Sequence, residues 1–332
     1  MQKKINWILI LQGWAMLWVV IGHSFVGDVE QREGWPSYMR LTYDFAYSFH
    51  MPLFMFISGY LFYMTRIDTK KKVWAYKDIV VDKAQRLLIP GAIFSVIAFG
   101  LKILFPGEVS RELHLNLSEI IHIIMYPFDN PLREVWFLIT LFWYFVLTPL
   151  WKLTMRNNTI IFFTMVMLVI LFFYHPDIKL LCVGRVFYYA IWFYSGMILC
   201  RTNAAEGFIS NNKWMTLLLG VAVYALASWI SPFFTRVGGI LFSLALALLL
   251  DKYFPSIFKT FRNYTYQIFL IGIFPQMFIK IVGSHIHLPV FLIWILCIAV
   301  GLYIPVLISL IIGKSQNTLL LSCLGLKPKH HG

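Results

Sequence analysis

Ten long apolar runs divide the chain, and they restrict the folds that it can adopt. A helix needs roughly 20 apolar residues to cross about 30 Å of hydrocarbon, and most of the runs approach that length. The mean hydropathy of +0.74, with only 13% charged residues, is too apolar for a soluble domain of this size. We therefore predict an all-α integral membrane protein with about ten transmembrane helices. The runs are Asn6–Val26, Asp44–Met64, Leu87–Phe105, Val135–Leu153, Thr159–Tyr174, Gly184–Cys200, Trp214–Ile230, Val237–Leu250, Tyr264–Val282 and Leu288–Ile312.

The basic residues indicate how these helices are oriented. The first run follows Lys3 and Lys4, lacks a small-residue cleavage site and contains Trp14, Trp18 and His23, so we interpret it as a retained helix rather than a signal peptide. With the N-terminus inside, 19 of the 28 Lys and Arg residues fall in inner loops, as the positive-inside rule requires. Both termini are thus predicted to be cytoplasmic. The net charge of +13 then reflects membrane topology, and we expect membrane lipids but no nucleic acid as partners.

No long soluble segment interrupts the apolar runs. The longest polar gap is Pro106–Glu134, where apolar and polar residues interleave as in a helix lying in the outer interface. Glu119 and His122 in this gap could share a metal ion, but their i, i+3 spacing suits a solvated helix face better. We expect one membrane domain over 1–315, a short basic cytoplasmic tail at 316–332, and no metal cofactor.

Two histidines within the apolar runs are candidates for catalysis, because polar side chains are costly in lipid. His23 lies near the outer end of the first run and His50 lies early in the second run, which returns inward. Both imidazoles should therefore lie in the outer third of the membrane on adjacent helices. An isolated histidine could simply hydrogen-bond the backbone or interfacial water. Two at one depth favour acid–base catalysis, because an imidazole with a pKa of about 6.5 can take a proton from an alcohol and return it to a leaving group.

Other polar or helix-bending residues accompany these histidines. Pro52 cannot donate to the carbonyl of Ser48, and Ser58–Gly59 permits close helix contact, which predicts a kinked helix beside a cavity or a kink that serves packing alone. Gln12 precedes His23 by eleven residues on the same helix face, roughly 16 Å along the axis. Its amide could line a tunnel and contact a bound cofactor, or it could make an interhelical hydrogen bond.

Arg86 ends a basic inner loop that also contains Lys72 and Lys83. A guanidinium here could hold the phosphates of a cofactor bidentately, whereas attraction to anionic lipid head groups would explain the lysines. Candidates for substrate binding near the outer interface, which could also be boundary residues, are Glu134, Trp136 and Arg185.

Five segments carry a resemblance to a known family. They are KINWILILQGWAMLWVVIGHSF, FHMPLFMFISGYLF, KAQRLLIP, VWFLITLFW and the small-residue turn FYSGM. In order and spacing the chain resembles the membrane acyltransferase family 3 over essentially its whole length, and its fucose 4-O-acetylase-like branch in particular.

The resemblance implies a ten-helix enzyme of the bacterial inner (cytoplasmic) membrane. Such an enzyme transfers an acyl group, most often acetyl, from cytoplasmic acyl-CoA to a sugar hydroxyl of a cell-surface polysaccharide or its lipid-linked precursor. It also implies that His23 is the catalytic base, that His50 is a second functional position, and that Arg86 contacts the acetyl-CoA or other acyl-CoA donor.

Three departures from the family pattern keep other functions open. Gln12 stands where the family has Arg or Lys, ILIL stands where an acidic residue is usual, and Gly272 replaces a histidine. One alternative is an exporter of a small acid or a glycan intermediate, although the sequence has no internal symmetry typical of a transporter. The other alternative is a catalytically inactive scaffold of the same fold.

Overall fold

The computed structural model describes residues 3–27, 33–68, 75–104, 116–227, 229–315 and 317–326, and within these ranges the chain forms helices and connecting segments without strands. Each of the ten predicted apolar runs falls on a helix. Among the described residues, six helices are long and apolar enough to cross a membrane, and two further candidates are helix pairs bent by 59°. The other two runs lie on shorter apolar helices. The all-α membrane class is confirmed, while ten crossings and cytoplasmic termini remain predictions.

The chain divides into two compact units. Unit 1 comprises residues 1–61 and 196–311, and unit 2 comprises residues 62–195 and 312–332. One membrane domain over 1–315 with a basic tail at 316–332 remains a prediction.

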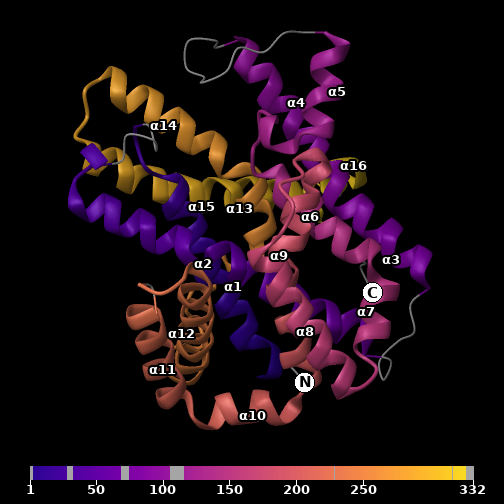
Figure 1. Ribbon diagram of the computed structural model, residues 1–332. Helices are drawn as coiled ribbons and strands as arrows, with labels where there is room; N and C mark the ends of the chain where they lie inside the picture. Colours follow the sequence, from indigo (N-terminus) through magenta and orange to yellow (C-terminus); the bar gives the residue numbers. More distant parts are fainter. Residues whose placement is uncertain are drawn as a thin grey trace. The chain divides into compact units, whose positions relative to one another are not determined.

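Unit 1 contains the helices that carry both candidate histidines (Figure 1). Its elements are α1 (Lys3–His23), α2 (Ser37–Phe62), the end of α9 (Val183–Arg201), α10 (Asn203–Asn211), α11 (Lys213–Ala227), α12 (Pro232–Tyr253), η7 (Arg262–Tyr264), α13 (Thr265–Ile271), α14 (Ile273–His285) and α15 (Val290–Lys314).

The division of the seventh and eighth runs at Ser231 and Pro232 is confirmed. The side chain of Ser231 caps α12 by accepting a 3.2 Å hydrogen bond from the amide of Phe233, and Pro232 occupies the first turn, where no intrahelical amide donor is needed. As a result α11 and α12 form two separate helices that lie side by side (Figure 1).

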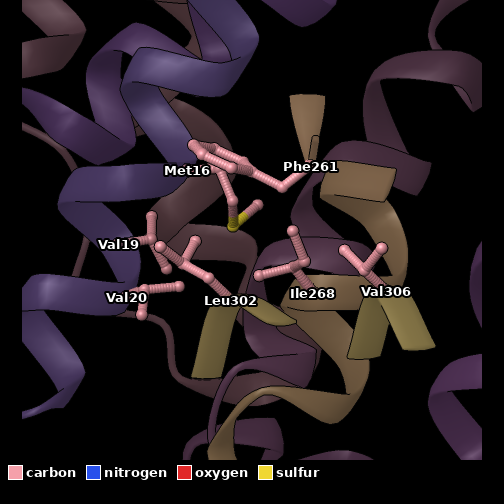
Figure 2. Close-up of a cluster of buried hydrophobic side chains, with 7 residues drawn as sticks. All are labelled: Met16, Val19, Val20, Phe261, Ile268, Leu302 and Val306. Carbon is pink, nitrogen blue, oxygen red and sulfur yellow. The ribbon is translucent and has the colours of Figure 1, made fainter. Parts of the chain in front are cut away.

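A cluster of buried apolar side chains packs α1 against α13 and α15. Figure 2 shows these side chains converging from the three helices and from the segment before η7. Close packing of this kind holds membrane helices together, because lipid offers the separated helices an equally apolar solvent. Since the cluster includes residues of the last two turns of α1, it anchors the end of the helix that bears His23. Its members are Met16, Val19, Val20, Phe261, Ile268, Leu302 and Val306.

Unit 2 contains the remaining helices, most of α9 and two short π-helical segments. Its elements are η2 (Tyr63–Ile67), α3 (Tyr76–Lys83), η3 (Ala84–Leu88), α4 (Ile89–Leu104), α5 (Leu117–Met125), η5 (Pro127–Asp129), α6 (Val135–Val146), α7 (Thr148–Thr154), α8 (Asn158–Phe173), η6 (Leu180–Cys182) and α16 (Thr318–Cys323).

The segment FYSGM is helical, so its prediction as a turn is wrong. It lies inside α9, and a Cβ atom at Gly196 would overlap the carbonyl oxygen of Phe56 on α2. The small residue at 196 therefore allows two helix backbones to approach closely within unit 1.

The second predicted run lies on a single helix. Helix α2 continues through Pro52, and a kink at this proline remains a prediction.

The predicted interfacial helix is present in part as α5, while residues 105–115 lie outside the described ranges. Asn116 caps it by accepting a 2.7 Å hydrogen bond from the amide of Glu119. The imidazole of His122 lies 2.9 Å from the carboxylate of Asp129. His122 thus pairs with an acid in the following segment, and exposed isoleucines cover another part of α5, as expected at a membrane surface.

Candidate active site

His50 is buried in α2, and its ring orientation is fixed by the backbone. Only 1% of the residue is exposed, and Nδ1 lies 2.5 Å from the carbonyl oxygen of Ala46. Because a carbonyl can only accept, the neutral ring must carry its proton on Nδ1 and a lone pair on Nε2. This is the tautomer that a proton acceptor working through Nε2 requires.

The structure brings the two predicted histidines together. His23 is the last residue of α1, is half-buried, and is close enough to His50 for the two side chains to interact electrostatically. The ring of Tyr47 lies beside both, with its centroid 6.1 Å from that of His23 and 4.9 Å from that of His50. Two imidazoles on neighbouring helices can accept and return a proton within one site.

Two residues of α14 at the end of α1 were not identified from the sequence. Lys280 donates a 2.7 Å hydrogen bond from Nζ to the carbonyl oxygen of His23. Gln276 donates from Nε2 to the carbonyl oxygen of Val20 at 3.0 Å and to the hydroxyl oxygen of Ser24 at 2.9 Å. A signal was available, because Lys280 is the sole charged residue in the run Tyr264–Val282.

An aromatic cluster adjoins the histidines. Phe25, just after α1, stacks on Trp35 and on Trp294, with ring centroids 5.4 Å and 5.7 Å away. Tyr43 stacks on Tyr47 at 4.2 Å. Aromatic rings of this kind suit a membrane–water interface.

Two of the three departures from the family pattern, Gln12 and Gly272, have different surroundings. Gln12 lies half-buried on α1, eleven residues before His23. Gly272 lies at the 59° bend between α13 and α14, where a Cβ atom would meet the carbonyl oxygen of Gly301 at 2.9 Å and that of Ile268 at 2.6 Å. A side chain at 272 would therefore require the backbones of α13 and α15 to shift.

Two of the predicted donor contacts, Arg86 and Lys83, lie in unit 2 on and beside a π-helical segment, whereas Gln12 lies on α1 in unit 1. Arg86 is exposed on η3 and interacts electrostatically with Arg66 on η2, which is 8% exposed and forms a 2.7 Å ion pair with Asp82. Lys83 places Nζ 4.6 Å above the ring of Phe145. A second guanidinium, that of Arg66, thus lies near the predicted group with its charge paired to Asp82, and π-helical turns often occur at functional sites.

Lys72, another predicted donor contact, lies outside the described residues.

The predicted saccharide contacts lie in unit 2, and two of them, Arg185 and Trp136, are within cation–π distance of each other. The guanidinium of Arg185 lies 5.0 Å from the ring of Phe128 and 5.9 Å from the ring of Trp136. Glu134 directly precedes α6, two residues before Trp136.

A cavity of about 1090 Å³ opens in unit 1 at the other end of α1 from His23. Asn6 and Asp251 contribute to its wall and are joined by a 2.5 Å hydrogen bond, while Arg262 donates to the side-chain oxygen of Asn6 at 2.8 Å. The wall of this cavity combines a few polar side chains with apolar ones, as small-molecule sites commonly do.

The fold and the histidine pair define an integral membrane protein that can perform acid–base chemistry at the end of a helix. A family model described as "Acyltransferase domain" matches residues 5–310. The chain therefore belongs to acyltransferase family 3 and is a membrane acyltransferase. The chain matches no curated protein and no solved structure.

Proposed function

We propose that this protein transfers an acyl group, acetyl in the simplest case, from cytoplasmic acyl-CoA to a sugar hydroxyl of a cell-surface polysaccharide or its lipid-linked precursor. The bacterial cytoplasmic membrane is the proposed location. The observation that carries the proposal is that His23 and a buried His50 both lie beside the ring of Tyr47, with Nδ1 of His50 engaged by the Ala46 carbonyl, within a chain of the acyltransferase family.

In the proposed reaction, His23 removes the proton from the sugar hydroxyl. The hydroxyl oxygen attacks the thioester carbonyl, the carbon–sulfur bond breaks, and the CoA thiolate takes up a proton from the imidazolium. His50 orients His23 or relays the proton through Nε2. The half-buried position of His23 allows substrate to reach it, whereas His50 is enclosed.

Further residues are proposed to bind the donor and the acceptor. Arg86, with Lys83 and Lys72, binds the phosphates of acyl-CoA, because guanidinium and ammonium groups suit phosphate oxygens. Gln12 supplies an uncharged hydrogen-bonding group on the His23 face of α1. Saccharide contacts are proposed for Glu134, Trp136 and Arg185.

The test is CoA release by the purified protein in bilayers, with acetyl-CoA and a panel of saccharide acceptors. His23→Ala should lower acceptor-dependent release by about 10²- to 10⁴-fold, the usual contribution of a general base. His285→Ala, a change at an exposed histidine of α14, serves as the matched control and should retain activity. Donor binding without turnover in the wild type, across the whole acceptor panel, would contradict the proposal.

The double variant His23→Ala with His50→Ala tests whether the two histidines work as one unit. If they do, the second substitution should add little to the loss caused by the first, because residues that act together show strongly non-additive effects. Independent, multiplicative losses would separate the roles of the two histidines.

One observation favours a second candidate function, export of a small acid or a glycan intermediate. The helix pairs α6–α7 and α13–α14 are each bent by 59°, one pair in each unit. Interrupted membrane helices form substrate sites in many transporters. Movement of a labelled saccharide across proteoliposomes without CoA release would support this function over acyl transfer.

A further inference from the structure

Backbone carbonyls at the end of α1 accept hydrogen bonds from side chains of another helix, α14. The last four carbonyl groups of any helix have no intrahelical donor, and α1 ends at His23. Lys280 donates to the carbonyl of His23 and Gln276 donates to the carbonyl of Val20. Two of these four carbonyls are therefore satisfied from α14, a helix more than 250 residues away in the sequence.

We propose that Lys280 and Gln276 are positioning residues that hold the terminal turn of α1, and with it the imidazole of His23, in the geometry needed for proton transfer. This inference rests on the proposed function of His23. Neither residue needs to touch a substrate, because both act through the backbone that carries the base.

The chemistry of the two side chains fits this role. An ammonium group is expensive in a membrane, but beside a helix C-terminus it faces the negative end of the helix dipole and makes a charge-assisted hydrogen bond. Gln276 uses both amide hydrogens, one on Val20 and one on Ser24. Ser24 in turn donates to the carbonyl of Val20 at 2.6 Å, so the first residue after α1 is tied to its last turn.

The surrounding helices hold these donors in place. Gln276 and Lys280 are four residues apart and so share one face of α14. The bend at Gly272 lets α13 contribute Ile268 to the apolar cluster of Figure 2 while α14 reaches the end of α1. On α15, Gly301 leaves the space that the Gln276 side chain fills. The end of α1 is thus fixed on its side by apolar packing and at its carbonyls by α14.

Kinetics of Lys280 variants can separate positioning from general stabilisation. A displacement of about 1 Å in a catalytic group can cost about 10²-fold in rate, so Lys280→Met should lower kcat by about 10- to 100-fold while the KM values for donor and acceptor change less than about threefold. Lys280→Arg keeps the charge and the donors and should recover kcat to within about fivefold. The matched control is Lys259→Met, a change at an exposed lysine of the same unit.

The same substitution in a His23→Ala background gives a second criterion. If Lys280 acts through His23, adding Lys280→Met to His23→Ala should leave the residual rate unchanged within about twofold. A further loss as large as that seen in the wild-type background would overturn the proposal. Equal losses in Lys280→Met and Lys259→Met would also overturn it.

A measurement that does not depend on enzyme activity tests this inference separately from the proposed function. The rate at which diethyl pyrocarbonate modifies His23, followed by mass spectrometry of its peptide, should rise at least threefold in Lys280→Met because the end of α1 is released. The rate at His122, a partly exposed histidine of unit 2, should not change. An unchanged rate at His23 contradicts the positioning role, whereas a raised rate in a protein that never releases CoA supports positioning and contradicts only the proposed reaction.

Discussion

Gly301 on α15 leaves the room that the amide of Gln276 on α14 occupies: a Cβ atom at Gly301 would lie 2.6 Å from Nε2 and 3.0 Å from Cδ of Gln276. The absent side chain at one position thus determines where the polar side chain at the other can point. Since Gln276 bonds the last turn of α1, a third helix takes part in arranging the histidine site.

Gly301→Ala should therefore weaken the site without touching a histidine. The added methyl group displaces Gln276 from Val20 and Ser24, and overpacking of this kind costs about 1–3 kcal/mol. We expect a lower thermal unfolding midpoint in detergent and a several-fold drop in kcat. Gly207→Ala is the control, because nothing lies within 4 Å of a Cβ atom at Gly207. An unchanged kcat in Gly301→Ala would show that acyl transfer does not depend on the position of Gln276.

Tyr47 should contribute through its ring, which lies beside both imidazoles and stacks on Tyr43. Tyr47→Leu removes the flat surface and should lower kcat for acyl transfer by about tenfold, because catalytic groups that lose their packing also lose alignment. Tyr47→Phe keeps the ring and should stay within about threefold of the wild type. Equal losses in the two variants would assign the effect to the phenolic hydroxyl instead.

Arg86 should affect donor binding and leave the chemical step unchanged. Loss of charge-assisted hydrogen bonds to a phosphate is worth about 1.5–3 kcal/mol, so Arg86→Gln should raise the KM for acetyl-CoA by about 10- to 100-fold. Arg86→Lys should fall between this variant and the wild type, because an ammonium group cannot make the bidentate contact. The control is Lys152→Gln, at an exposed lysine of α7. A fall in kcat at saturating donor, with KM unchanged, would contradict donor binding by Arg86.

The ion pair between Arg66 and Asp82 should stabilise unit 2. Arg66 is 8% exposed, so Asp82→Asn leaves a largely buried guanidinium with a weaker partner, at a cost of about 1–3 kcal/mol. We expect a lower thermal unfolding midpoint for Asp82→Asn than for Asp78→Asn, which alters an exposed acid one turn earlier. The double change Arg66→Met with Asp82→Leu should recover most of the loss, because a buried ion pair can be replaced by apolar packing. A midpoint for the double variant as low as that of Asp82→Asn would show that apolar side chains cannot replace the ion pair.

Much of the helix pattern could be predicted from the sequence, because apolar length is a local property. Each predicted run falls on a helix, and even the short break at Ser231 and Pro232 separates two helices. The segment FYSGM was predicted wrongly for a physical reason. Small residues occur both in turns and at close helix contacts, and the packing partner Phe56 on α2 decides between them.

The sequence by itself determined the membrane class, the places of the apolar helices, the acyltransferase resemblance and the choice of His23 and His50. These conclusions depend on neighbouring residues and on the cost of polar groups in lipid. Only the tertiary structure decided which groups serve the histidines: Ala46 for the ring of His50, and Lys280 for the end of α1. The partner of a buried polar group is set by helix packing, which brings together residues that hydropathy and spacing along the chain cannot pair.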